Sequence, residues 1–179
     1  MRGSRQTSIS NTPRPADRIE HMTIRLLIID DHPIVRLGLA ALLSLQGDIE
    51  VIGSVGSGQD ALSKISSIPI DIVLVDLRMP GLSGVDTLLK IKEIDPRTRS
   101  IVLSSFEHDE EIYAAVKAGA KGYLHKEAPA EEILNAIRAV YSGREAFPRR
   151  IAERLSCRNM TAGLSEREAS ASTRCKRID

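Results

Sequence analysis

Five short apolar runs alternate with longer segments whose apolar residues recur at helical spacing, and this alternation limits the possible folds more than any other feature. The runs cover residues 24–29, 49–55, 71–76, 99–105 and 121–125. Short runs that are apolar on both faces are typical of buried strands in a parallel sheet. The pattern therefore predicts an α/β domain, with a doubly wound, five-stranded parallel sheet and five helices on its two faces.

The segments between the runs each carry an apolar stripe with the three- and four-residue spacing of a helix. In the first segment we expect Ile34, Leu37, Ala41 and Leu45 to cover the sheet. The other predicted stripes are Ala61, Leu62, Ile65 and Ile68; Val85, Leu88, Leu89 and Lys92; Ile112, Ala115 and Val116; and Ile133, Ala136, Ile137 and Val140.

Side chains that can take part in chemistry follow four of the five predicted strands. Asp30 and Asp31 end the first strand, Asp76 the third, Ser104 the fourth and Lys126 the fifth. Each of them alone has an ordinary explanation as a helix cap, a turn residue or a surface charge. The carboxyl ends of parallel strands meet at one edge of the sheet, where ligands bind. We therefore expect three carboxylates, a hydroxyl and an ammonium group to converge there.

The adjacent carboxylates of Asp30 and Asp31 are unfavourable together unless a positive charge neutralises them. Mg²⁺, or Mn²⁺ in its place, prefers oxygen ligands of this kind. The pair therefore indicates a divalent cation, and an acidic loop without a ligand is the alternative.

The joint pattern DD, VDLRMPG, LSS and GYLHK resembles the receiver domain of bacterial two-component response regulators, over residues 22–143. The LRMPG after Asp76 and the KE after GYLH resemble the NarL/FixJ subfamily in particular. The resemblance implies a flavodoxin-like (CheY-like) fold in which Asp76 is the phosphoacceptor. It also implies a Mg²⁺ site made by Asp30, Asp31, Asp76 and the backbone carbonyl of Arg78, and a switch made by Ser104, Tyr123 and Lys126.

In the mechanism that the resemblance implies, Ser104 binds the phosphoryl group and its loop moves, so that Tyr123 turns inward. A partly buried strand aromatic is the alternative interpretation of Tyr123. Glu127 follows Lys126 where many receivers have proline, as is common in this subfamily. We interpret His32 and His125, which flank the site, as loop or strand residues.

The resemblance further implies partners: a sensor histidine kinase as phosphoryl donor, and a second copy of the chain in a phosphorylation-dependent homodimer. Transcription control and DNA binding would require a LuxR-type helix-turn-helix domain. Only its first residues are recognisable, in GLSERE from Gly163 to Glu168. The distribution of charge also indicates that the receiver segment itself does not bind DNA. Residues 22–143 carry a net charge of −5, while residues 1–21 carry +2 and residues 144–179 carry +4. A net negative charge on the main segment is unfavourable for contact with phosphates.

The ends of the chain lack periodicity. We interpret residues 1–21 as a disordered arm consistent with vector origin, because His21-Met22 resembles a cloning junction. We interpret 144–163 as a linker with a short helix, and 164–179 as the truncated start of the helix-turn-helix domain with an atypical tail. Two cysteines without a CxxC motif, no apolar stretch long enough for a bilayer and no secretory signal predict a cytoplasmic protein without a membrane partner.

Two other functions remain open. A stand-alone receiver could relay phosphoryl groups without an output domain, although the linker and the LSERE fragment argue against this. A Mg²⁺-dependent aspartyl phosphohydrolase would need an acid two residues after its nucleophile, and Arg78 occupies that position. No phosphate-binding GxxxxGK[ST] loop is present, and GSVGSG at 53–58 is not a dinucleotide fingerprint. We therefore expect no enzyme activity beyond assistance to the chain's own phosphorylation and dephosphorylation.

Overall fold

Strands and helices alternate along the computed structural model, which describes residues 23–106, 108–153 and 155. The elements are β1 (Ile24–Ile29), α1 (Pro33–Ser44), β2 (Ile49–Val55), α2 (Gly58–Ile65), β3 (Ile72–Asp76), α3 (Gly84–Ile94), β4 (Arg99–Ser104), α4 (Asp109–Lys117), β5 (Gly122–His125) and α5 (Ala130–Tyr141). The predicted α/β architecture is confirmed. The predicted strands differ from these bounds by at most one residue, at Asp71, Ser105 and Lys121.

The five strands form one parallel sheet in the order β2-β1-β3-β4-β5. The strand that follows α1 lies on one side of β1 and the strand that follows α2 lies on the other. The winding direction therefore reverses between β1 and β3. In open α/β sheets this reversal opens a crevice beyond the carboxyl ends of the two strands. Both β1 and β3 are followed by the aspartates predicted to form the site.

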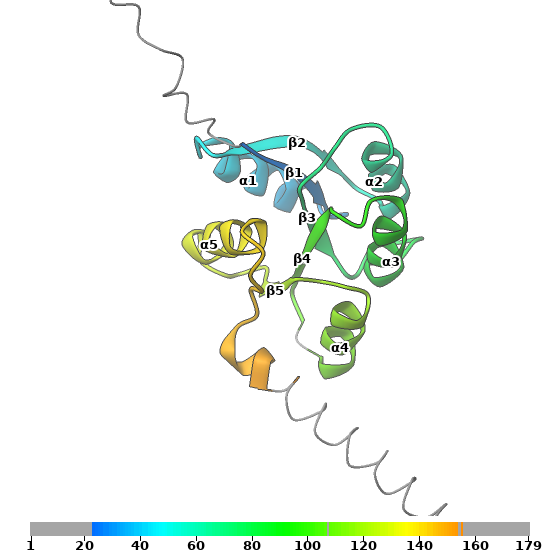
Figure 1. Cartoon of the computed structure of the whole chain (residues 1–179), viewed down its shortest axis with the longest axis vertical. Helices are drawn as coiled ribbons and strands as arrows, with labels where there is room; N and C mark the ends of the chain where they lie inside the picture. Colours follow the sequence, from blue (N-terminus) through cyan, green and yellow to red (C-terminus); the bar gives the residue numbers. More distant parts are fainter. Residues whose placement is uncertain (1–22, 107, 154, 156–179) are drawn as a thin grey trace, which may run out of the picture.

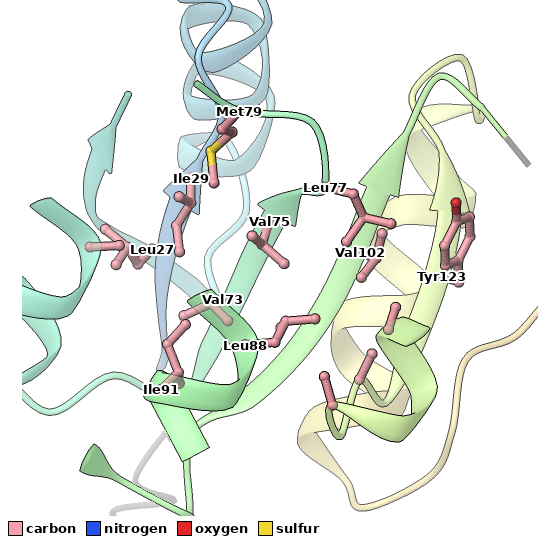
Figure 2. Close-up of a cluster of buried hydrophobic side chains, with 14 of the residues drawn as sticks. Leu27, Ile29, Val73, Val75, Leu77, Met79, Leu88, Ile91, Val102 and Tyr123 are labelled. Carbon is pink, nitrogen blue, oxygen red and sulfur yellow. The ribbon is translucent and has the colours of Figure 1, made fainter. Parts of the chain in front are cut away.

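Helices cover both faces of the sheet, with α1 and α5 on one face and α2, α3 and α4 on the other (Figure 1). Each face has its own apolar core. The core on the α2–α4 side includes Leu27, Val75, Leu88 and Tyr123 (Figure 2). Burial of aliphatic side chains at about 25 cal/mol per Å² provides the main stabilisation of such layers.

The prediction of which α1 residues face the sheet is wrong. Ile34 and Leu37 are 84% and 71% exposed, and Leu45, the C-cap residue, is 83% exposed. Leu39 and Leu43 pack against the sheet instead. Since α1 is apolar on almost every side, its periodicity fits two stripes equally well. The sheet covers one of them and leaves the other in solvent.

Two helices begin at serine caps that their sequences provide. Ser57 accepts a hydrogen bond from the backbone of Asp60 at 3.2 Å, and Ser83 accepts one from Asp86 at 3.1 Å. In both cases the serine hydroxyl donates back to the aspartate carboxylate. These caps satisfy backbone groups that a helix start leaves free, and the second one fixes the start of α3 close to β3.

The domain boundaries predicted from the sequence remain predictions. Residues 1–21 and 164–179 lie outside the described part of the chain. The start of the segment predicted as a linker, residues 144–153, is described and contains one helical turn from residue 149.

Candidate functional site

The register of the central strands brings two aspartates together. Ile29 pairs with Val75, so the next residues along β1 and β3, Asp30 and Asp76, emerge side by side. Asp30 is 2% exposed and Asp76 is 4% exposed. Carboxylates this deeply buried require partners, because burial disfavours the charged form.

Lys126 supplies positive charge to both of these carboxylates. Its Nζ donates to Asp76 Oδ2 at 2.6 Å and lies 2.7 Å from Asp30 Oδ2. Burial works to lower the pKa of Lys126, but the hydrogen bonds and charges of Asp30 and Asp76 outweigh it and raise the pKa. The ammonium group is therefore held in its charged form between the ends of β1 and β3.

His32 also lies among the carboxylates. Its Nδ1 is 2.7 Å from Asp31 Oδ1, 3.2 Å from Asp30 Oδ1 and 3.9 Å from Asp76 Oδ2. His32 is a loop residue that flanks the site, as the sequence predicts, and the structure adds the contact of its ring with the carboxylates. Its position directly after Asp31 was the available signal. The backbone of His32 also donates to Asp30 Oδ1 at 2.8 Å, which fixes the orientation of that carboxylate.

The site has the donors of a divalent-cation site. Ligand atoms of Asp30, Asp31, His32 and Asp76 lie within 4.8 Å of one another. Asp30 Oδ2 lies 2.7 Å from Lys126 Nζ, and Asp31 Oδ1 lies 2.7 Å from His32 Nδ1. Three carboxylates face one ammonium group, so negative charge is in excess. Hard oxygen donors with uncompensated charge fit Mg²⁺ or Mn²⁺.

The loop after β3 holds Asp76 from the other side. The backbone N–H of Arg78 donates to Asp76 Oδ1 at 3.1 Å. At the start of α3, a Cβ on Gly84 would lie 2.3 Å from the carbonyl oxygen of Asp76. Only glycine allows α3 to begin this close to β3. The predicted metal-binding role of the Arg78 carbonyl stays a prediction.

The Arg78 side chain points to α4 rather than to the carboxylates. It donates to Glu111 Oε1 at 2.8 Å and 3.1 Å, and its guanidinium lies 3.9 Å from the centroid of the Phe106 ring. Phe106 is a contact that the sequence interpretation missed, because no motif marks it.

Ser104 and Tyr123 meet through Phe106. Ser104, 1% exposed, accepts a hydrogen bond from the Phe106 backbone N–H at 3.2 Å. The Tyr123 hydroxyl donates to the Phe106 carbonyl at 2.8 Å. Tyr123 is fully buried in this arrangement, so the ring already occupies the inward position that we expected it to reach after phosphorylation. Its role as a switch residue stays a prediction.

The structure thus brings together Asp30, Asp31, Asp76 and Lys126 at one edge of the sheet. Ser104 pairs with His125 across β4 and β5, one residue before Lys126, and the backbone of Lys126 donates to the Ser104 carbonyl at 2.9 Å. His125 lies beside this edge as a strand residue, and its Nε2 is 3.1 Å from the Ser105 carbonyl.

Comparison with known families agrees with this geometry. The sequence profile of the response regulator receiver domain matches residues 26–138, which is more than half of the chain. The chain belongs to the response regulator receiver family. It is thus a receiver of the two-component type, and the NarL/FixJ subfamily is supported by the relatives.

Among curated proteins, the receiver is 39% identical over 126 residues to the response regulator proteins VraR of Staphylococcus epidermidis and Staphylococcus aureus. These matches cover 70% of this chain and 60% of the length of each relative. The chain therefore matches a little over half of those proteins.

Solved structures give the same result. The signal receiver domain of the response regulator NarL from Mycobacterium tuberculosis is 33% identical with a TM-score of 0.65, and the match covers 68% of this chain and 98% of that one. A LuxR-family two-component response regulator from Aurantimonas is 29% identical with a TM-score of 0.71, over 77% of this chain and 99% of that one.

The family is one of signalling receivers rather than conventional enzymes. Of the helices in the described part of the receiver, none combines the length and the apolar character that a membrane span needs.

Proposed function

We propose that this receiver accepts a phosphoryl group on Asp76 from a phosphohistidine of a sensor histidine kinase, in a Mg²⁺- or Mn²⁺-dependent reaction, and that it changes conformation in response. The observation that carries the proposal is the contact of Lys126 Nζ with Asp76 Oδ2, in a site where Asp30 and Asp31 supply further carboxylates.

The proposed step is a transfer between two nucleophiles. A carboxylate oxygen of Asp76 attacks phosphorus and forms an acyl phosphate. The bond from phosphorus to the histidine nitrogen breaks, and the imidazole leaves with its electron pair. Lys126 and the Arg78 backbone N–H orient the two oxygens of Asp76, one each. This orientation lowers the barrier by positioning.

Asp30, Asp31 and Asp76, with the Arg78 carbonyl, would hold the metal ion. When bound, the ion would neutralise charge on the phosphoryl oxygens. The ammonium group of Lys126 would remain available to the phosphoryl group, because its raised pKa keeps it charged at neutral pH.

We further propose that phosphorylation promotes homodimer formation and controls transcription through a DNA-binding domain, in the protein to which this receiver belongs. The incomplete coverage of the VraR proteins supports an output domain rather than a stand-alone relay. The apolar stripe that α1 leaves in solvent supports a second copy as partner, since apolar patches of this kind mark interaction surfaces.

Hydrolysis of small phosphate esters is not part of the proposal. The position of the required acid is held by Arg78, whose guanidinium donates to Glu111. A guanidinium group does not give up its proton at physiological pH.

The test is covalent mass. Treatment with Mg²⁺ and acetyl phosphate should add one phosphoryl group to the wild-type chain and none to Asp76→Asn, while the control Asp86→Asn on α3 should be modified like wild type. An adduct of wild-type stoichiometry on Asp76→Asn would remove Asp76 from its proposed role.

A further inference from the structure

The segment after α5 closes the free edge of the sheet. β5 is the last strand in the order, so one side of its backbone is unpaired by other strands. The Ala146 N–H donates to the Lys121 carbonyl at 2.8 Å, and the Tyr123 N–H donates to the Ala146 carbonyl at 3.0 Å. We call residues 144–153 and 155 the arm. Cover of an edge strand by such a segment removes exposed donors and acceptors.

Gly122 makes the close approach of the arm possible. A Cβ at this position would lie 3.0 Å from the carbonyl oxygen and 3.3 Å from the Cβ of Ala146. The contact between β5 and the arm is therefore tight, and small shifts of β5 are felt by the arm.

Beyond the edge, the arm adds apolar side chains to the core on the α2–α4 side. Ile151 is fully buried there, and Phe147 and Leu155 pack against the same core. The three residues are spaced every fourth position, and Pro148 begins the helical turn by accepting the backbone N–H of Ile151 at 2.8 Å. The arm thus contacts the receiver through both its backbone and its side chains. Residues 144–153 and 155 therefore belong structurally to the receiver domain and are not a free linker.

Tyr123 belongs both to the predicted switch and to the docking site of the arm. Its N–H donates to the arm, its ring lies in the core that contains Ile151 (Figure 2 shows the ring), and its hydroxyl donates to Phe106. The Phe106 N–H in turn donates to Ser104. A continuous series of contacts therefore joins the residue expected to bind the phosphoryl group to the arm.

We propose that the arm is a phosphorylation-sensitive latch, docked on β5 in the arrangement described here and loosened when Ser104 turns towards a phosphoryl group on Asp76. This inference rests on the proposed function. Movement of Ser104 withdraws the acceptor of the Phe106 N–H, which displaces the carbonyl that holds the Tyr123 hydroxyl and disturbs the core around Ile151. Every residue after 155 is attached to the receiver through the arm, so loosening it changes how the following part of the protein is held.

Because arm docking and binding at Asp76 are thermodynamically linked, the latch can be tested by measuring either of them. If a phosphoryl analogue weakens arm docking by some factor, then loss of arm docking must strengthen binding of that analogue by the same factor. The probe is beryllofluoride with Mg²⁺, added to the whole 179-residue chain.

The first measurement is backbone hydrogen exchange of the peptide that spans 144–153. Saturating beryllofluoride should speed exchange there by on the order of fivefold, and Ser104→Ala should abolish this change while beryllofluoride still binds. Unchanged or slower exchange in the wild-type arm, with beryllofluoride bound, would overturn the latch.

The second measurement is beryllofluoride affinity by calorimetry. Ile151→Asp, and the milder Ile151→Ala in case the first variant does not fold, should bind several times more tightly than wild type. Ala152→Asp, an exposed position on the same helical turn, should bind like wild type. Equal affinities for wild type and Ile151→Ala would also overturn the latch.

The failure of the proposed function is distinguishable from the failure of this inference. If the wild-type chain takes up no phosphoryl group from acetyl phosphate and binds no beryllofluoride, the proposed function is at fault. If both bind at Asp76 and the arm does not respond, only the latch is at fault.

Discussion

Lys126 shows how a single residue makes this site possible. Two carboxylates that are almost completely buried, Asp30 and Asp76, face its ammonium group within 2.7 Å. Removing one partner of a buried ion pair is costly mainly because the remaining charges lose their compensation. Loss of the Lys126 ammonium group would leave both Asp30 and Asp76 without this compensating charge.

We therefore expect Lys126→Gln to lose on the order of 3 kcal/mol of unfolding free energy in metal-free buffer. Saturating Mg²⁺ should recover part of the loss, because the ion restores positive charge beside Asp30 and Asp76. Lys121→Gln is the matched control, since its exposed pair with Glu145 should be worth less than about 1 kcal/mol. Urea unfolding with and without Mg²⁺ measures both variants. A Lys126→Gln protein as stable as wild type without metal would contradict this account.

The site could be predicted from the sequence only as far as strand ends determine it. Asp30, Asp76 and Lys126 follow buried strands, and the edge of a parallel sheet brings such positions together. The places of His32 and Phe106 depend on the paths of loops. Neither residue lies in a periodic pattern. The position of His32 directly after Asp31 indicates that it is near the carboxylates but not where its ring points, and no spacing in the sequence places Phe106 between Ser104 and Tyr123.

At the scale of elements, a charged contact ties the starts of β1 and β3. Arg25 donates to Asp71 through its backbone N–H at 2.9 Å and through its guanidinium at 2.8 Å and 3.0 Å. Burial works to raise the pKa of Asp71, but the hydrogen bonds from Arg25 outweigh it and lower the pKa below its usual value of 3.8.

A lowered pKa in the folded state gives stability that is present above the unfolded pKa and is lost as the pH falls through the folded value. Asp71→Asn should therefore melt at a lower temperature than wild type at pH 7, and the difference should shrink steadily below pH 3.8. Glu153→Gln, which removes an exposed pair with Arg149, should show little difference at either pH. Melting curves across this range decide the matter, and a difference that grows in acid would refute the assignment.

The helices show where periodicity is informative and where it is not. In α5, polar residues interrupt the pattern, and the predicted residues Ile133, Ala136, Ile137 and Val140 are all buried. In α1 almost every residue is apolar apart from Arg36, so the pattern fits two stripes, and the predicted stripe is the one that lies in solvent. Only the tertiary contact with the sheet distinguishes them.

At the scale of the whole molecule, the alternation of strands and helices was enough to predict a doubly wound parallel sheet, because parallel strands need crossover connections. The docking of the arm was not predictable in the same way. Residues 144–153 contain one helical turn and one pairing residue, Ala146, and such short features carry no periodic signal. They are held by a surface that exists only after the rest of the domain has folded.

The exposed stripe of α1 leads to a prediction about assembly. In the described part of the chain, the three most exposed large apolar side chains are Ile34, Leu37 and Leu45. In a two-fold dimer the same patch lies on both subunits, and an uncharged stripe can meet its own copy without repulsion. The stripe alone is small beside the about 800 Å² per partner that a stable interface buries. We therefore expect a weak contact that phosphorylation strengthens.

Sedimentation should show mainly monomer without ligand, and a shift towards dimer with Mg²⁺ and beryllofluoride. Leu37→Glu should abolish the shift, because two apposed carboxylates would be buried without partners. Leu89→Glu on α3, where the side chain is also exposed, should dimerise like wild type. Both variants should still bind beryllofluoride, which shows that the site is intact. Dimerisation of Leu37→Glu at wild-type concentrations would mean that the second copy contacts another surface.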